Sequence, residues 1–542
     1  MIMKKEKEEV LPIGREEVKA ATRTLFGYRL AKAKLNERLS ENEKWYRLRH
    51  GESLNGGDTP VSAWLFNCIA SKHADSMDSI PIASVLAREE ADRAEAERLS
   101  EIIPQILEQN GFEQTFSDEQ WYKLKNGTGV FGVFWDGSKS GGLGDIAVTK
   151  IDLTDLYWQP GVNDIQKSEN LFHTELIDNA VLEREYPSLI GKLGTGRCGA
   201  SGLEIMAESA DKSLVVDWYY RVNVGGKTVL HYCKYVGENV IFATENTEAY
   251  RESGLYAHGM YPFVFDVLFP VENSPAGFGY IDVGKNAQEY IDRGDTAVME
   301  NLLSNARPRH FIRSDGAVNE KEFADLSNTF IHVDGNLGAD SIMPVQSTPL
   351  NDVYLKVISG KIEELKETTG NRDVSTGGTT SGVTAAAAIA AMQEAGSKLS
   401  RDATKQSYRA FAKLVDLIIE LIRQFYVFPR PFRVTDRRGT EKFIRYGNAG
   451  LLPEPQGSDF GIDTGTRLPK FRVTVSSENR DPYSRASQNE LALKLYEAGF
   501  FDPENRAKAE KCLEIMDFNG REKLLGAISG SKISGEKACP DD

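Results

Sequence analysis

Two amphipathic stretches of similar length, residues 280–306 and 349–370, enclose a short segment of mixed character and constrain the fold more than any other feature. A helix is predicted over the first stretch, because apolar and small residues recur on one helical face and Pro308 disfavours helix at the residue before it. At about 1.5 Å per residue, the two helices are each roughly 30–38 Å long. We expect a matched pair of helices whose far ends are joined by the enclosed segment.

The second stretch carries helix signals at both ends. Thr348 and Pro349 are typical of an N-cap and a first helical turn, and Gly370 is typical of a helix terminus. Between them, apolar residues recur at alternating spacings of three and four. The residues expected to pack the two helices together are Ile291, Val298, Leu302, Ile358, Ile362 and Leu365.

The enclosed segment, residues 307–348, is predicted to form a small α/β unit. The expected elements are a strand at "HFIR", a short helix at "NEKEFADL", and strands at "TFIHV" and "SIMPV".

The rest of the chain favours an α+β fold class that is predominantly helical. Residues 16–110 are predicted to be mainly helical, and from "WYKLKNGTGVFGVFWDG" onwards the periodicity changes to strands. A long helix is expected over residues 383–427, with one apolar face formed by Phe411, Val415, Ile418, Ile422 and Phe425. A hairpin at "PFRVTDRRGTEKFIRY", a strand at "KFRVTVSS" and a helical module from Ser487 follow, before a polar tail that we expect to be disordered.

Composition excludes several classes of protein. The 542 residues suffice for several domains, and a net charge of −15 argues against adhesive binding to nucleic acid. Five scattered cysteines without a C-x-x-C pair indicate neither a disulfide framework nor a zinc site, and they suggest a reducing compartment. We do not expect the N-terminus to be an ordinary secretory signal, and the most apolar predicted helix, residues 411–428, contains too many charges to span a membrane.

Signals for catalysis are weak. "VNVGGKTVL" ends like a phosphate-binding loop, but Arg221 stands where the first glycine should be, and a hairpin turn at Gly225 and Gly226 is the better interpretation. The glycine-rich stretch at residues 137–145 also lies between predicted strands. The seven histidines show no metal-ligand spacing. We therefore expect no catalytic residues, no metal and no cofactor.

An uncharged loop of glycines and hydroxyl residues directly precedes the long helix. Glycines there can take either sign of φ, so the loop can present backbone N–H groups and hydroxyls without a net charge. Local composition alone favours an ordinary flexible linker. The residues concerned are Ser375, Thr376, Gly377, Gly378, Thr379, Thr380, Ser381 and Gly382.

Three stretches of the C-terminal half resemble the portal, or head-tail connector, proteins of tailed bacteriophages: "PVENSPAGFGYIDVGKNAQEYID", "TGNRDVSTGGTTSGVTAAAAIAAMQEAGSKLSRD" and "SRASQNELALKLYEAGFFDPENRAKAEKCLEIMDF". The resemblance implies an order of domains along the chain. They are an N-terminal wing (1–279), a stem helix (280–306), a clip (307–348), a second stem helix (349–370), a tunnel loop (371–384), a long helix returning to the wing with a β-hairpin (385–482), a helical crown (483–530) and a disordered tail (531–542).

The resemblance also implies a function and partners. It implies a homododecameric ring at one capsid vertex, through which double-stranded DNA is packaged and later ejected without sequence-specific contacts. It places the tunnel loop against the DNA. Terminase, head-tail connector or adaptor proteins, and the major capsid and scaffold proteins are the expected partners, and no membrane is involved. The expected location is the virion, with assembly in the host cytoplasm.

Two other functions stay open at this point. One is a virion assembly or adaptor protein that forms no channel, and the other is an enzyme of the DNA packaging machinery. The missing phosphate-binding loop disfavours the second.

Overall fold

The computed structural model describes residues 12–51, 60–193, 211–224, 227–306, 310–312, 319–325, 330–332, 342–344, 351–370, 398–435, 441–456, 458–459, 462–463, 465–477, 494–499, 509, 511 and 513. The chain divides into two compact units. Unit 1 contains Met1–Leu39, Lys72–Gly279 and Ser400–Asp542, and unit 2 contains Ser40–Ser71 and Tyr280–Leu399. Helices and sheets occur together, which confirms the α+β class.

Two antiparallel sheets form the centre of unit 1. The smaller has the order β3-β2-β9, with strands at Asp145–Lys150, Thr128–Asp136 and Phe263–Val267. The larger has the order β4-β5-β6-β7-β8, with strands at Leu156–Trp158, Asn170–Asp178, Lys212–Val224, Lys227–Val236 and Asn239–Ala243.

The pairing of β6 with β7 decides one of the weak enzyme signals. Val224 pairs with Lys227, so the intervening glycines join two antiparallel strands. A phosphate-binding loop joins a strand to a helix. The hairpin interpretation is confirmed, and the stretch at residues 137–145 likewise lies between β2 and β3.

The helices of unit 1 cover these sheets. The N-terminal part of α1 (Arg15–Tyr46) buries Val18, Ala21 and Leu25 in a cluster with Phe172 and Tyr235 of the larger sheet. The other helices are α2 (Trp64–Met77), which like α1 extends across the boundary between the units, α3 (Arg93–Gln109), α4 (Phe112–Asn126), α5 (Asn179–Glu185) and α10 (Lys398–Phe425). Short 3-10 turns lie at Glu90–Asp92, Ser140–Gly142, Leu153–Asp155, Ile165–Lys167, Pro187–Leu189 and Asn448–Leu451.

The apolar face predicted for the long helix is confirmed in α10. Phe411, Val415, Ile418 and Ile422 are buried in the main core of unit 1, and Phe425 packs against that core. The first half of the predicted helix, before Lys398, lies outside the described residues.

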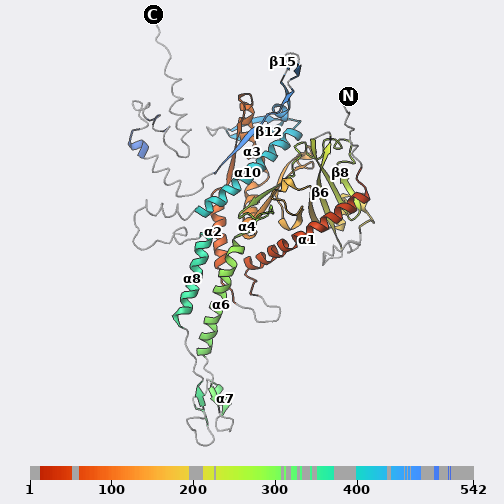
Figure 1. Ribbon diagram of the computed structural model, residues 1–542. Coiled ribbons are helices and arrows are strands. Elements are labelled where there is room, and N and C mark those ends of the chain that lie inside the picture. Colours follow the sequence, from red (N-terminus) through yellow and green to blue (C-terminus); the bar gives the residue numbers. More distant parts are fainter. Residues whose placement is uncertain are drawn as a thin grey trace. The chain divides into compact units, whose positions relative to one another are not determined.

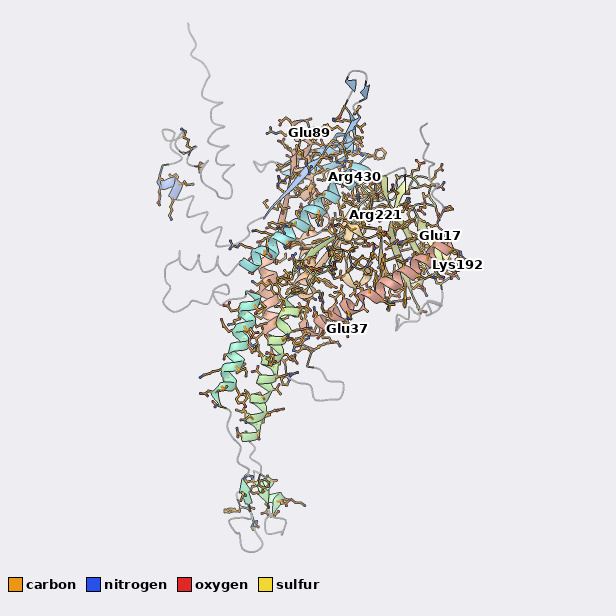
Figure 2. The ribbon with its side chains drawn as sticks, viewed as in Figure 1. Glu17, Glu37, Glu89, Lys192, Arg221 and Arg430 are labelled. Atoms are coloured by element: carbon orange, nitrogen blue, oxygen red, sulfur yellow. The ribbon has the colours of Figure 1, made fainter. Side chains whose placement is uncertain are left out.

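Figure 2 labels Arg430, which begins the first strand after α10. Its guanidinium lies 4.2 Å from the centre of the Tyr426 ring, and its Nη1 atom donates a hydrogen bond to the Gly144 carbonyl over 2.5 Å. The predicted hairpin then forms from β12 (Arg430–Thr435) and β13 (Glu441–Tyr446). Short strand pairs follow at Glu454–Pro455 with Thr466–Arg467, and at Ser458–Asp459 with Ile462–Asp463.

Two predictions for the N-terminal half are wrong. Residues Pro81–Ala87 were expected to be helical but form strand β1, which pairs antiparallel with β18 (Phe471–Ser477). Their side chains alternate between buried and exposed, so pairing with a distant strand overrides the helical preference of the following residues. Trp121–Asn126 was expected to begin a strand but ends α4, which is terminated by Gly127 at φ 86°.

Unit 2 contains the predicted pair of long helices. α6 spans Tyr280–Ala306, which confirms the first predicted helix. α8 spans Asp352–Thr369 and begins later than predicted, because the side chain of Asn351 caps it by accepting a hydrogen bond from the Val353 N–H. Thr348, the predicted cap, lies outside the described residues. Gly370 ends α8 in the left-handed conformation at φ 68°, as its sequence position predicted.

Between these helices, the described residues form β10 (His310–Ile312), α7 (Glu320–Ala324) and β11 (Ile342–Pro344), with β10 and β11 antiparallel. The prediction of a strand at "TFIHV" is wrong, because residues 330–332 do not belong to a strand. The backbone N–H of His332 instead donates to Oε2 of Glu322 over 2.7 Å, so a side chain takes the place of a strand partner.

No helix in the described ranges is long and apolar enough to cross a membrane.

Candidate functional site

The candidate site is the pair of helices α6 and α8, which lie side by side and run in opposite directions (Figure 1). A Cβ atom added at Gly294 would lie 2.7 Å from Cγ1 of Ile358. Seven residues later along α8, Leu365 lies against Gly284 near the start of α6. The antiparallel direction follows from these two contacts.

Glycine allows the close approach of the two helices. A Cβ atom at Gly284 would lie 2.7 Å from Cδ1 of Leu65 and 2.8 Å from Cδ1 of Leu365, closer than carbon atoms pack. Glycine destabilises a helix interior, but here it allows the two helices to pack closely. Gly294 belongs to the stripe seen in the sequence, whereas Gly284 gave no signal there.

The residues predicted to pack these helices differ in burial. Ile291 and Leu365 are buried, Ile358 meets Gly294, and Val298 and Ile362 are half-buried. Leu302 is 59% exposed in the single chain.

Large apolar side chains are exposed on both helices. On α6 they are Tyr290, Met299, Leu302 and Leu303, and on α8 they are Val353, Tyr354, Leu355 and Val357. They do not share one face, so the pairing of α6 with α8 leaves apolar surface on both helices.

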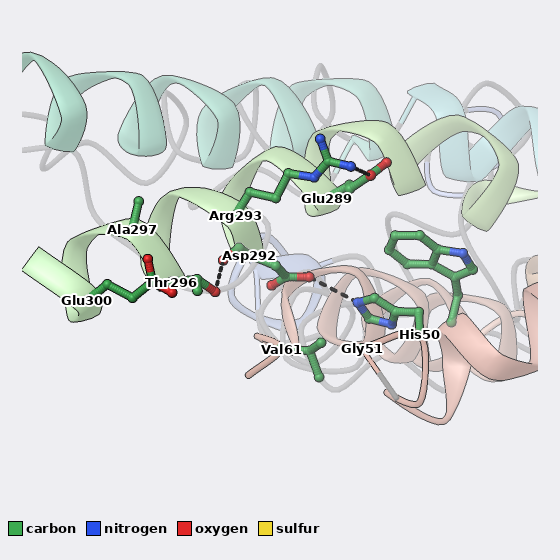
Figure 3. Close-up of a pocket in the computed structure, with 10 residues that line it drawn as sticks. His50, Gly51, Val61, Glu289, Asp292, Arg293, Thr296, Ala297 and Glu300 are labelled. Carbon is green, nitrogen blue, oxygen red and sulfur yellow. Dashed lines mark hydrogen bonds and ion pairs between the residues drawn. The ribbon is translucent and has the colours of Figure 1, made fainter. Parts of the chain in front are cut away.

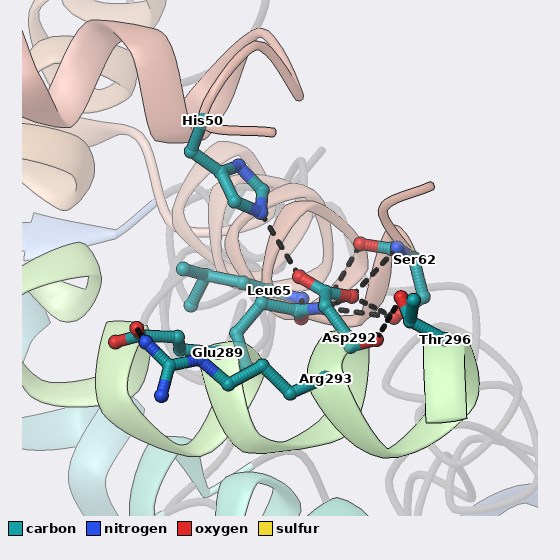
Figure 4. Close-up of polar contacts among 8 residues, drawn as sticks. His50, Ser62, Leu65, Glu289, Asp292, Arg293 and Thr296 are labelled. Carbon is teal, nitrogen blue, oxygen red and sulfur yellow. Dashed lines mark hydrogen bonds and ion pairs between the residues drawn. The ribbon is translucent and has the colours of Figure 1, made fainter. Parts of the chain in front are cut away.

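Two segments of unit 2 are held against α6 by a polar cluster (Figure 4). Gln288, buried on α6, accepts a hydrogen bond from the Leu65 N–H over 3.0 Å and donates to the hydroxyl of Ser62 over 2.8 Å. Asp292, one turn later, accepts from the Ser62 N–H over 2.8 Å and from its hydroxyl over 2.9 Å. These bonds fix residues 62–65 on α6.

His50 completes the cluster from the segment after α1. Its Nε2 atom lies 3.0 Å from Oδ2 of Asp292, and the two side chains are only 10% and 9% exposed. The imidazole stacks on Trp45 with ring centres 3.8 Å apart. Burial raises the pKa of Asp292, but hydrogen bonds from His50, Ser62 and Gln288 outweigh burial and hold that pKa below its usual value.

A pocket of about 390 Å³ opens beside this cluster (Figure 3). Its wall on α6 carries three carboxylates, of which Glu289 is paired with Arg293. Residues that line it include Trp45, His50, Val61, Asp292, Thr296 and Glu300.

The cluster does not have the geometry of a nucleophilic relay. In such a relay the histidine lies between the hydroxyl and the carboxylate and removes the hydroxyl proton. Here Asp292 lies between His50 and Ser62, and the serine hydroxyl donates to the carboxylate. The arrangement anchors segments and does not activate Ser62. Within the described part of the chain, no group of three or more His, Cys, Asp or Glu residues could hold a metal ion.

The predicted DNA-facing residues, Ser375 to Gly382, lie outside the described residues.

The polar cluster on α6 was missed by sequence reasoning. His50, Ser62 and Asp292 are far apart in the chain, and none of them stands in a recognisable motif. The one available signal was the charged Asp292 beside the apolar stripe of α6.

The family model described as "Phage P22-like portal protein" matches residues 75–535 of the chain. No curated protein matches this chain. Among solved structures, the neck of a native gene transfer agent particle, computed with C12 symmetry, is 10% identical with a TM-score of 0.38, and covers 86% of this chain and 90% of that chain. A virion of a native gene transfer agent particle is 11% identical with a TM-score of 0.35, and covers 83% and 89%.

Proposed function

The chain belongs to the phage P22-like portal protein family, and we propose that it forms a dodecameric ring at one capsid vertex that conducts double-stranded DNA during packaging and ejection. This is a structural role in the virion and not an enzymatic one. The observation that carries the proposal is the apolar surface left exposed on both α6 and α8.

This surface supports assembly through unlike faces. A monomeric protein rarely leaves several large apolar side chains exposed along one pair of helices. Identical copies can cover them when α6 of one copy packs on α8 of the next. Such a contact is heterologous, and it generates a closed ring when the rotation between copies divides the full circle.

The charge of the chain suits a conduit. A channel must pass any DNA sequence, and a strongly basic lining would hold the phosphates by counterion release. A net charge of −15 disfavours such retention. We assign brief contact with DNA to the uncharged tunnel loop, residues 371–384, with Ser375 to Gly382 as the contacting residues.

The remaining segments take roles in the same assembly. We assign α6 and α8 to the stem, residues 307–348 to a clip that docks terminase and then head-tail connector proteins, and residues 483–530 to the crown. Capsid and scaffold proteins surround the ring in the virion, and assembly takes place in the host cytoplasm.

Negative-stain electron microscopy of the purified chain tests the proposal. We expect rings with a central hole wide enough for a DNA duplex, and native mass measurement should give twelve copies. The variant Leu303→Asp introduces a charge on exposed α6 surface and should lower the fraction of rings. Leu30→Asp on α1 is the matched control, because Leu30 is 61% exposed and Leu303 is 55% exposed. A strictly monomeric protein, or a multimer without an opening, would overturn the proposal.

A further inference from the structure

The pocket on α6 lies on the side that α8 leaves open. Each helical residue turns the side-chain direction by about 100°. Gly294 faces Ile358 of α8, and Thr296 in the pocket wall lies two residues further on, about 200° around the helix. The α6 wall of the pocket therefore lies on the side of the helix away from α8, and Trp45, His50 and Val61 of the same chain form the opposite wall. In a ring, a neighbouring copy would approach α6 from this side.

Lys356 has the corresponding position on α8. It lies two residues before Ile358, so it points away from α6 by the same rotation of about 200°. It is exposed, and no ion pair among the described residues includes it. Gly360, one turn further along the same side, has no atom of the described residues within 4 Å of the place of a Cβ. This side of α8 is open to close approach by another helix.

The lysine and the pocket also lie at the same height. α6 and α8 are antiparallel and rise equally per residue, so the contact of Gly294 with Ile358 puts Lys356 level with Thr296. Copies in a cyclic ring are related by rotation about one axis, which leaves height along that axis unchanged. With the helices along the axis, Lys356 of one copy reaches the height of the pocket in the next.

The pocket chemistry suits an ammonium group. Glu300 has no ion pair among the described residues, and the carboxylate of Asp292 is satisfied by neutral donors and His50. With Glu289 neutralised by Arg293, the pocket keeps a negative charge. Nδ1 of His50 has no hydrogen-bond partner among the described residues. Trp45 and Val61 offer apolar surface for the methylene chain of a lysine.

Resting on the ring proposed above, we propose that Lys356 of each copy inserts into the pocket of the next copy, between Glu300 and the cluster of His50 and Asp292. The pocket is then completed only by a second copy of the chain. The inserted lysine fixes the register of α8 against the neighbouring α6, while the exposed apolar side chains supply most of the buried area.

Disulfide trapping tests the register directly. In the chain with Lys356→Cys and Thr296→Cys, the two cysteines lie on opposite outer sides of the helix pair and cannot join within one chain, so a bond between them links copies. We expect a ladder of covalent oligomers on oxidation, seen on denaturing gels without reductant. The control pairs Lys356→Cys with Glu289→Cys. Glu289 lies on the same side of α6 as Thr296 but about 10 Å nearer the start of the helix, so this pair should give no ladder. Each single variant should also give none.

Charge reversal gives a second measurement. Lys356→Glu or Glu300→Lys alone should weaken association between neighbours by about tenfold or more, and the combined swap should restore it. Rings that form normally in microscopy but give no ladder, or a swap that restores nothing, would overturn this inference and leave the proposed ring intact. Rings that give no ladder but bind free spermidine, and lose that binding in Glu300→Gln, would also overturn this inference, because the pocket would then hold a cation from solution and not Lys356. Wild-type protein that forms no rings at all would instead overturn the proposed function.

Discussion

The Nζ atom of Lys123 lies 2.8 Å from Oδ1 of Asp266, and neither side chain is exposed to solvent. The pair joins α4 to β9, and Lys123 also donates to the Ser407 hydroxyl of α10 over 2.7 Å. Gln120 donates to Oε2 of the buried Glu119 beside them over 2.8 Å. This network ties three elements of unit 1 together through charges that water cannot reach.

Removing one member of the pair should be costly. Lys123→Met leaves Asp266 buried without its cation, and breaking a buried pair in this way costs about 3–5 kcal/mol. We expect a lower urea midpoint at fixed protein concentration. Lys413→Met, an exposed lysine on α10, is the control and should change the free energy of unfolding by no more than about 0.5 kcal/mol. Equal effects of the two variants would contradict the role of the network.

Glu119 should make unit 1 less stable as the pH rises. Burial, and secondarily the charge of Asp266, raise the pKa of Glu119 well above its usual value. The folded state therefore keeps a proton that the unfolded chain releases above about pH 4.3, so stability declines above that pH. Glu119→Gln removes this titration. The stability of the wild type relative to Glu119→Gln should be greater at pH 5 than at pH 7, and a constant difference would refute the prediction. Glu108→Gln, at an exposed site on α3, should show no such trend.

Lys32, in contrast to Glu119, should make the protein more stable as the pH rises, and in a higher pH range. Its Nζ atom donates to the Leu156 carbonyl over 2.6 Å, and burial lowers the pKa of Lys32 to about 7. The unfolded lysine titrates near about pH 10.4, so the folded state gains stability as the pH rises from about 7 towards 10. Lys32→Met should abolish the gain between pH 7 and pH 9 in urea unfolding. The exposed neighbour Lys34 is the control, because Lys34→Met should keep it.

Replacing glycine by alanine should destabilise the protein at one helical site and stabilise it at another. Gly284→Ala places a methyl group against Leu65 and Leu365, and such overpacking costs about 1–3 kcal/mol. Gly27→Ala in α1 meets no atom of the described residues within 4 Å and should stabilise the protein by about 0.5–1 kcal/mol, because alanine favours helix. Urea unfolding of both variants measures the difference. A stabilising Gly284→Ala would show that α6 and α8 are not closely packed there.

The proposed tunnel loop can be tested by packaging. Replacing Gly377 and Gly378 with valine restricts the backbone, because valine has fewer allowed backbone conformations than glycine. We expect rings to assemble normally in microscopy while DNA packaging in vitro is impaired. Thr379→Lys with Thr380→Lys should slow translocation, because the added cations attract phosphates. Normal genome filling by the valine variant would count against the assignment of this loop.

Local periodicity made much of the fold predictable. α6, the apolar face of α10 and the hairpin β12–β13 all follow from spacings within a single element, and the sequence displays such spacings directly. The terminus of α8 at Gly370 followed from the chemistry of one residue. These features depend on neighbours along the chain.

Contacts between distant segments were not predictable. Strand β1 alternates only weakly in its sequence, and its partner β18 lies nearly at the other end of the chain. The approach of His50 and Ser62 to Asp292 depends on how residues 50–65 return along α6, and no spacing encodes that path. The buried pair of Lys123 and Asp266 was hidden for the same reason, because a charged residue in a sequence looks the same whether it is solvated or paired.

The pairing of β1 with β18 sets a timetable for biosynthesis. Domains fold as units while the chain leaves the ribosome, N-terminal segments first. The side of β1 that β18 covers stays unpaired until residues beyond 470 have emerged, so the nascent chain holds an unpaired strand edge during most of translation. Unit 1 therefore cannot be completed before residue 477 has been made, and a product truncated before β18 would leave the partner edge of β1 uncovered.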